Sequence, residues 1–249
     1  AREKDWQAPS FVRELFEGNF RVGLIHPYPE PSAADVERAR PFLERLERFM
    51  REKVDSDRID REGKIPPDVI QGLRDLGAFG IKIPLEYGGL GLSQLMYTKA
   101  IGLVTSQDGS MTALLSAAQS IGVPTPLKLF GTPEQKKRFL PRLAKGAISA
   151  FALTETHVGS DPAGVATHAE LSADGTHYLL NGEKLWCTNG TIAELFVVMA
   201  RTTGKRITAF IVEREWPGVE VAQRLHFMGV KAIENGVSRF TNVKVPVEN

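Results

Sequence analysis

The first half of the chain arranges its hydrophobic and polar positions with a helical period. Between about residues 32 and 146, apolar side chains recur at three- and four-residue steps, which places them along one side of a helix. The longest series follows Ser32, which can cap a helix, and we expect Pro41 to kink or restart that helix. The apolar members of the series are Val36, Ala39, Leu43, Leu46, Phe49 and Met50.

Start signals predict further helices in this half. One begins near Pro67, and one follows the glycine loop EYGGLGL and is capped by Ser93. Another opens at Thr132, where Gln135 three positions later completes a capping box. Residues 110–122 read SMTALLSAAQSIG and are apolar nearly all round. Such a segment is typical of a helix buried in the middle of a bundle.

After residue 147 the pattern changes to alternating β-branched and aromatic positions broken by turn dipeptides. Asp174-Gly175 and Thr203-Gly204 mark hairpins, and Asn181-Gly182 marks a possible turn inside the longest segment. Many short strands in about a hundred residues indicate an antiparallel β-sandwich or barrel. Strands are expected near residues 148–154, 166–172, 177–188, 193–201, 206–213, 219–222 and 236–245.

The two halves together predict an α+β fold. A length of 249 residues is enough for two domains of ordinary size, each with its own core. We expect an N-terminal extension over residues 1–31, an all-helical bundle domain over 32–147 and the β domain over 148–249.

Charge and cysteine content exclude several classes of function. The net charge is +1 and basic residues are mixed with acidic ones, so neither nucleic acid nor an anionic membrane surface is an expected partner. The single cysteine, Cys187, excludes internal disulfides and multi-thiolate metal sites and fits a reducing compartment. The five histidines are dispersed without an HExxH motif, so no metal site is predicted. We expect neither an export signal nor a membrane span.

Two nearby segments could carry chemistry. In a strand through KLWCTNG, residues 184–190, Trp186 and Thr188 face one way and Cys187 the other, towards the core. An indole beside a hydroxyl suits a planar heteroaromatic cofactor, although a strand tryptophan is more often an ordinary core residue. Phosphate-binding GxGxxG or Walker-type loops and the GxSxG motif of hydrolases do not occur.

The second segment is FALTETHVGSD, residues 151–161. Backbone N–H groups and the hydroxyl at its Gly159-Ser160 turn could hold a phosphate oxygen. The plainer alternative is an ordinary loop in which Asp161 is a turn or cap residue. His157, next to Thr156 and near Glu155, is best interpreted as a surface-loop histidine.

Taken together, these segments resemble the acyl-CoA dehydrogenase family of flavoproteins. FALTETHVGSD is similar to the family's first signature and KLWCTNG to its second, with Thr156 in place of the usual proline and Phe151 in place of a frequent tyrosine. IPLEYGGLGL, FGTPEQKKRFLPRLAKG and KAIENGVSRFTNVKVPVEN resemble other family segments, and SFVRELFEGNF with PYPEP is similar to the very-long-chain branch.

The resemblance implies an FAD cofactor between the middle domain and a C-terminal four-helix domain. Phe151, Leu153 and Thr154 are then expected along the flavin ring, Trp186 beside it and the Thr188 hydroxyl near its reactive nitrogen. Gly159 and Ser160 are expected at the phosphate and ribityl part, with Ser160 also near the entering acyl-CoA. The acyl tail is expected along a helix where the small residues Ala113, Ser116 and Ala117 leave room for a long chain or simply allow close helix packing.

The family reaction removes the α-proton of an acyl-CoA with a carboxylate base while a hydride passes to flavin. The base belongs to the C-terminal domain, which is absent from residues 1–249, so we assign no catalytic residue and expect this fragment alone to be inactive. The implied partners are a long-chain acyl-CoA, an electron-transfer flavoprotein and, at full length, a second copy in a homo-oligomer. An acyl-CoA oxidase-like enzyme and a non-catalytic scaffold protein are the alternatives. The expected location is the bacterial cytoplasm or, alternatively, the mitochondrial matrix.

Overall fold

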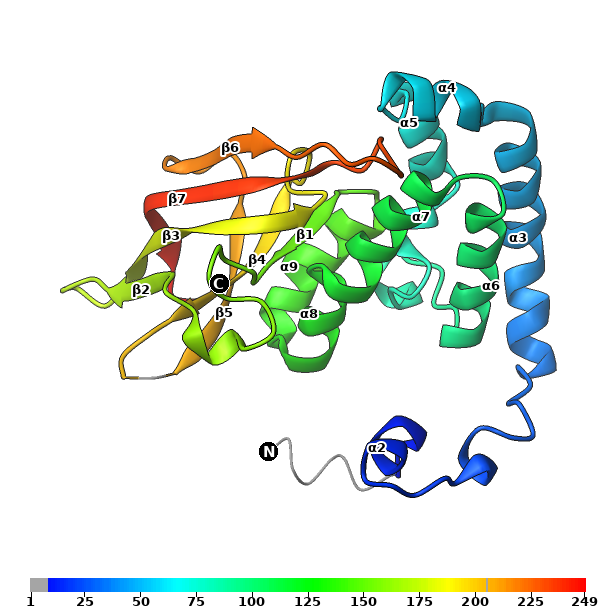
Figure 1. Ribbon diagram of the computed structural model, residues 1–249, viewed down its shortest axis with the longest axis horizontal. Coiled ribbons are helices and arrows are strands. Elements are labelled where there is room, and N and C mark those ends of the chain that lie inside the picture. The colour runs from blue at the N-terminus through cyan, green and yellow to red at the C-terminus, as the bar shows by residue number, and fades with distance from the viewer. Residues whose placement is uncertain (1–8, 205) are drawn as a thin grey trace.

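Helices precede strands along the chain, as the α+β prediction requires (Figure 1). The computed structural model describes residues 9–204 and 206–249, except for the side chains at positions 120 and 121. The α-helices are α2 (Phe11–Phe16), α3 (Ala33–Lys53), α4 (Ser56–Glu62), α5 (Pro67–Asp75), α6 (Gln94–Thr105), α7 (Gly109–Ser116), α8 (Pro124–Phe130) and α9 (Pro133–Ala144). The strands are β1 (Ser149–Ala152), β2 (His168–Leu171), β3 (His177–Thr188), β4 (Leu195–Arg201), β5 (Ile207–Glu213), β6 (Val219–Arg224) and β7 (Asn235–Pro246).

The predicted helix starts are confirmed by their capping bonds. The hydroxyls of Ser32 and Ser93 each accept a backbone N–H three residues later, and Thr132 forms the complete capping box with Gln135. The predicted restart at Pro41 is wrong, because α3 runs without interruption from Ala33 to Lys53. Pro41 lies on the exposed side of α3, where water can replace the hydrogen bond that proline removes.

The buried helix predicted over residues 110–122 is confirmed in position but not in geometry. The first part is α7, and a π-helical segment, η4 (Ala117–Ile121), follows it without a break. The side chains of the last two positions of η4 lie outside the described residues. The change of geometry falls where η4 contacts β1 and where Asn189, directly after β3, bonds to α7.

The sheet has seven strands in the order β1-β4-β2-β3-β7-β6, with β5 paired to β4. The predicted antiparallel pairing holds for four pairs, but β4 runs parallel to β1 and to β2, so the sheet is mixed and not wholly antiparallel. The predicted turn at Asn181-Gly182 is wrong: β3 continues through a bulge there, paired with β2 and β7. Gly182 has φ +149°, and a Cβ atom on it would lie 2.4 Å from the Thr167 hydroxyl. The glycine therefore permits close strand contact instead of a reversal.

Three apolar clusters hold the elements together. One fills the helical part around Leu46, Leu73 and Met96, and one lies inside the curled sheet around Phe196 and Phe240. The third joins α8 and α9 to the outer face of β4 and β5, so these helices cover that face (Figure 1).

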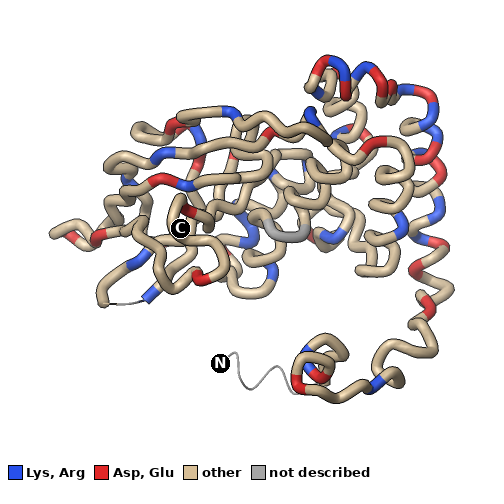
Figure 2. Tube along the Cα trace, viewed as in Figure 1, with Lys and Arg blue, Asp and Glu red and all other residues tan. Residues whose placement is uncertain are grey.

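The surface charges agree with the composition. Acidic and basic residues alternate over α3, α4 and the strands, and neither sign forms a continuous face in the view of Figure 2. Among the described residues, no helix combines the length and hydrophobicity that crossing a membrane requires.

The segment from residue 9 to residue 31, here called the N-terminal arm, stands apart from the rest of the chain (Figure 1). Every hydrogen bond and ion pair described for it stays within it, including Arg13–Glu17 and Arg21–Glu14. Its large apolar side chains are mostly exposed, and Phe16 is 89% accessible. The arm therefore contributes little to the stability of the helical core.

Deleting residues 1–31 is expected to leave the melting temperature of the 249-residue chain unchanged within about 2 °C, since every hydrogen bond and ion pair described for residues 9–31 stays within that segment. Differential scanning calorimetry of the two chains measures this directly. A drop of about 5 °C or more would show that the arm packs on the body of the protein.

Candidate functional site

The two segments singled out by sequence lie side by side. The backbone N–H of Leu185 on β3 donates to the carbonyl of Thr154, just after β1, at 2.8 Å. The ammonium of Lys184 donates to the carbonyl of Leu153 at 3.0 Å. These bonds bring the Leu153-Thr154 backbone next to the end of β3 that carries Trp186 and Thr188. Phe151 lies half-buried on β1 against the α8–α9 cluster.

Trp186 is not a core residue, so the interpretation of it as an ordinary core tryptophan is wrong. A bulge between Lys184 and Cys187 turns its side chain outward, where it is 62% accessible, with φ +55°. A left-handed backbone is unfavourable for a bulky residue. An exposed indole held in a strained conformation is a strong sign of a binding surface. Cys187 is buried, as predicted, and burial raises the pKa of its thiol to about 11, so it is not a reactive nucleophile.

Thr188 sits beside Trp186 with a polar neighbour on the adjacent strand. The Asn235 amide of β7 donates to the Thr188 hydroxyl at 3.2 Å. The other amide atom of Asn235, its Oδ1, is buried and has no hydrogen-bond partner within the described part of the chain. An apolar face and an unsatisfied polar edge therefore meet at the end of β3.

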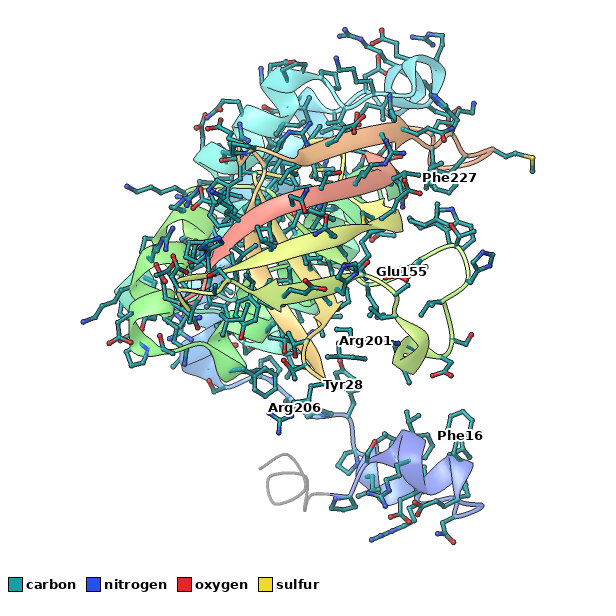
Figure 3. All side chains as sticks on the ribbon, turned by 90° about the vertical axis from the view of Figure 1, so that its left-hand side faces the viewer. Phe16, Tyr28, Glu155, Arg201, Arg206 and Phe227 are labelled. Atoms are coloured by element: carbon teal, nitrogen blue, oxygen red, sulfur yellow. The ribbon has the colours of Figure 1, made fainter. Side chains whose placement is uncertain are left out.

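Sequence reasoning missed the ion pair that shapes this site. The side chain of Lys184 is fully buried and lies 2.7 Å from the Glu155 carboxylate. That carboxylate also accepts hydrogen bonds from the N–H of Ala166 and from the N–H and hydroxyl of Thr167. Glu155 thus ties together both ends of the loop over residues 156–165 (Figure 3). A lysine and a glutamate inside the two motifs were the available signal, but the two residues are 29 positions apart and only the packing of β3 against the end of β1 brings them together.

These bonds set the ionisation of Glu155. Burial alone would raise its pKa, but the hydrogen bonds from Lys184, Thr167 and Ala166 outweigh burial and lower the pKa from 4.5 to about 2. Since the folded pKa lies below the unfolded value, the ionised group stabilises the fold above pH 4.5, and this contribution is lost as the pH falls towards about 2.

The free energy of unfolding of the wild type should therefore exceed that of Glu155→Gln most strongly above pH 4.5, and the difference should narrow between about pH 4.5 and about pH 2. Urea denaturation at half-unit pH steps measures the difference. Glu183→Gln removes a carboxylate from an exposed ion pair with Arg239 and is the control, because it should change the free energy of unfolding little at any pH. A constant wild-type advantage down to pH 2 would contradict this account of Glu155.

The loop closed by Glu155 carries the remaining predicted cofactor residues. Gly159 and Ser160 are exposed at its tip. The carboxylate of Asp161 accepts the N–H of Ala163 at 3.0 Å, so the predicted cap role is confirmed. His157 is exposed, as expected for a surface-loop histidine.

The predicted acyl-lining residues lie on a different element. Ala113 and Ser116 are half-buried on α7, and Ala117 begins η4. The amide of Asn189, directly after β3, donates to the carbonyl of Leu114 at 3.0 Å, which joins α7 to the end of β3. A cavity of about 250 Å³ nearby is lined by Leu114 and Asn189 but by none of the predicted site residues.

This arrangement can bind and orient a flat aromatic group more readily than it can perform acid–base chemistry. Trp186 offers an apolar surface, and Thr188 and Asn235 offer hydrogen bonds at its edge. Glu155 is engaged by its partners, so it is not a free base. No cluster of three or more potential metal ligands occurs among the residues with defined positions.

The fold combines a helical part with a curled mixed sheet, and an exposed tryptophan with a polar edge lies at the end of β3. Residues 37–147 match the family model for the acyl-CoA dehydrogenase N-terminal domain, and residues 150–243 match the model for the middle domain. The chain therefore belongs to the acyl-CoA dehydrogenase family.

The relatives include bacterial and mitochondrial proteins. The probable acyl-CoA dehydrogenase FadE10 of Mycobacterium tuberculosis is 54% identical over 254 residues, covering 100% of this chain and 39% of the relative. The mitochondrial very long-chain specific acyl-CoA dehydrogenase of Mus musculus is 40% identical over 264 residues, covering 100% of this chain and 40% of the relative. The structure of an acyl-CoA dehydrogenase from Bacillus anthracis complexed with FAD superposes with a TM-score of 0.73 at 34% identity, covering 88% of this chain and 37% of that one. The chain thus spans about two fifths of the length of these proteins.

Proposed function

We propose that the whole protein is an FAD-dependent acyl-CoA dehydrogenase that converts a long-chain acyl-CoA to the trans-2-enoyl-CoA. The observation that carries this proposal is the exposed, strained Trp186 beside Thr154 and Thr188 at the junction of the two motif segments. A flat ring with a polar edge, such as a flavin, is the kind of group that this surface fits. The solved structure of the Bacillus anthracis relative is a complex with FAD, which supports the choice of this flavin.

In this proposal each of the site segments has a binding role. Phe151, Leu153 and Thr154 line the ring, Trp186 packs beside it and Thr188 donates a hydrogen bond near its reactive nitrogen. Gly159 and Ser160 contact the phosphate and ribityl portion, and Ser160 also contacts acyl-CoA. When bound, FAD supplies the hydride-accepting chemistry, and these residues orient it. We place the helical domain at residues 32–147 and the β domain at 148–249.

The residues of this chain orient the reactants but do not abstract the proton. The Glu155 carboxylate is held by Lys184 and Thr167 and closes the loop of Ser160, which gives it a positioning role. The base is proposed to lie on a further domain of the full-length protein, so residues 1–249 alone should show no turnover. A general base has to lie within hydrogen-bond reach of the α-proton, directly or through one water.

The finer assignments rest on the same relatives. We propose long acyl chains because Ala113, Ser116 and Ala117 are small and because the mouse relative is specific for very long chains. We propose an electron-transfer flavoprotein as acceptor, a homodimer or tetramer at full length, and a bacterial cytoplasmic location in keeping with the mycobacterial relatives. Sedimentation of the full-length protein as a monomer would contradict the oligomer.

The test is the visible spectrum of the purified full-length protein. Flavin bands that bleach on anaerobic addition of palmitoyl-CoA are expected, with reoxidation by electron-transfer flavoprotein and little consumption of oxygen. Rapid oxygen consumption would favour the oxidase-like alternative. A folded protein that takes up no FAD would contradict the proposal and favour a scaffold role.

A further inference from the structure

The helix that carries Ala113, Ser116 and Ala117 changes its geometry where it reaches the β domain. The α-helical pattern of α7 gives way to the π-helical turn of η4, and the N–H of Gly122 donates to the carbonyl of Ala117 at 2.8 Å. π-Helical turns are rare and occur mostly at functional sites. Because such a turn shifts the backbone bonds by one residue, neighbouring side chains are needed to satisfy the displaced groups.

Two side chains of the β domain satisfy groups on both sides of this turn. The hydroxyl of Ser149, fully buried on β1, donates to the carbonyl of Ala118 at 3.0 Å and accepts the N–H of Val123 at 3.2 Å. The amide of Asn189 donates to the carbonyl of Leu114 at 3.0 Å and to that of Ser149 at 3.3 Å. Asn189 from the second proposed flavin segment and Ser149, two residues before the first, therefore hold the acyl-lining helix.

The contact is close enough to restrict what can stand there. A Cβ atom on Gly122 would lie 2.3 Å from the Ser149 hydroxyl, so glycine is required for the hydroxyl to reach the helix. Asn189 has φ +66° and is 1% accessible, and asparagine is one of the few residues that adopt this backbone readily. Gly122 and Asn189 therefore occupy positions in this junction that few other residues could fill.

The opposite side of the π-helical turn is held by the helical domain. The buried side-chain amide of Gln119 donates to the carbonyl of Ala78 at 2.7 Å and accepts the N–H of Ile81 at 3.1 Å. The hydroxyl of Thr125 donates to the carbonyl of Gln119 at 2.7 Å. The end of the helix is therefore bonded to both the helical part and the sheet.

We infer that Ser149 and Asn189 are positioning residues that set the acyl-length preference by holding the Ala113–Ala117 face of the helix at a fixed place relative to the flavin segments. The inference rests on the proposed function, in which the acyl tail lies along that face, and it takes the face as the base of the acyl site. A short acyl group ends before the base, whereas a long one has to pack against it. Loosening the π-helical turn should therefore affect long substrates selectively.

The experiment uses the full-length protein and the variant Ser149→Ala. We expect kcat/KM for palmitoyl-CoA to fall about five- to tenfold, the size typical of one or two lost buried hydrogen bonds, while the value for butyryl-CoA stays within about twofold. The dissociation constant of trans-2-hexadecenoyl-CoA, measured by titration calorimetry, should rise by a similar factor without any turnover. Ser238→Ala is the matched control, since Ser238 is a fully buried strand serine on β7 with no described bond to this helix.

Equal losses for both substrates, or no loss for either, would overturn the inference, because a merely structural serine affects all chain lengths alike. If Ser149→Ala does not fold, the ratio of kcat/KM for palmitoyl-CoA to that for butyryl-CoA is measured for Asn189→Gly instead. Glycine keeps the left-handed backbone at this position while removing the side-chain amide. A wild-type protein whose flavin is reduced by neither substrate would overturn the proposed function itself. An active wild type with an unchanged ratio in the variant would overturn only the role of Ser149 and Asn189.

Discussion

Replacing Lys184 by methionine should lower the free energy of unfolding by about 3 kcal/mol, because removing one partner of a buried ion pair leaves the other charge uncompensated. The value is expected at the lower end of the usual range, since Glu155 keeps its three bonds from Ala166 and Thr167. Guanidinium denaturation of the wild type and variant measures the loss. The Leu153 carbonyl also loses its partner, so flavin retention by the full-length protein should fall in parallel.

A double-mutant cycle that combines Lys184→Met with Glu155→Gln tests whether loss of the ion pair causes this destabilisation. The double variant should be less destabilised than the sum of the single variants by at least about 1 kcal/mol, since no lone charge remains. Arg239→Met breaks the exposed ion pairs of Arg239 on β7 with Glu183 and Glu220; it should cost no more than about 1 kcal/mol and is the control. Strictly additive single effects would show that Lys184 and Glu155 act independently.

Replacing Trp186 by glycine should weaken FAD binding about 10- to 100-fold, the effect of losing one aromatic stacking surface and its contacts. The same change should leave the stability of the cofactor-free protein unaltered or raise it by up to about 1 kcal/mol, since glycine relieves the left-handed backbone at φ +55°. Flavin fluorescence titration of the apoprotein and urea denaturation measure the two effects.

The opposite directions of these effects separate a binding role from a packing role. Trp186→Phe keeps an aromatic face and should retain most of the affinity, which makes it the control. A variant Trp186→Gly that is strongly destabilised with unchanged flavin affinity would show that the indole is a packing residue despite its exposure.

Much of the fold followed from short-range signals. The caps at Ser32, Ser93 and Thr132 were predictable because an N-cap needs only a hydroxyl and the N–H three residues later. The positions of the strands also followed from alternation and turn dipeptides. Pro41 and Asn181-Gly182 were misjudged for one shared reason: a local breaker signal is overridden when exposure or pairing on both sides favours continuation.

The sequence by itself determined the family, the order of helices and strands, and the two segments that bear the proposed flavin contacts, because each depends on residues close together in the chain. Only the tertiary structure decided that Trp186 faces outward, that Lys184 pairs with Glu155 and that Ser149 and Asn189 hold a π-helical turn. These features depend on bulges and on bonds between residues up to 75 positions apart, as between Leu114 and Asn189. Side-chain alternation along one strand carries no information about such contacts.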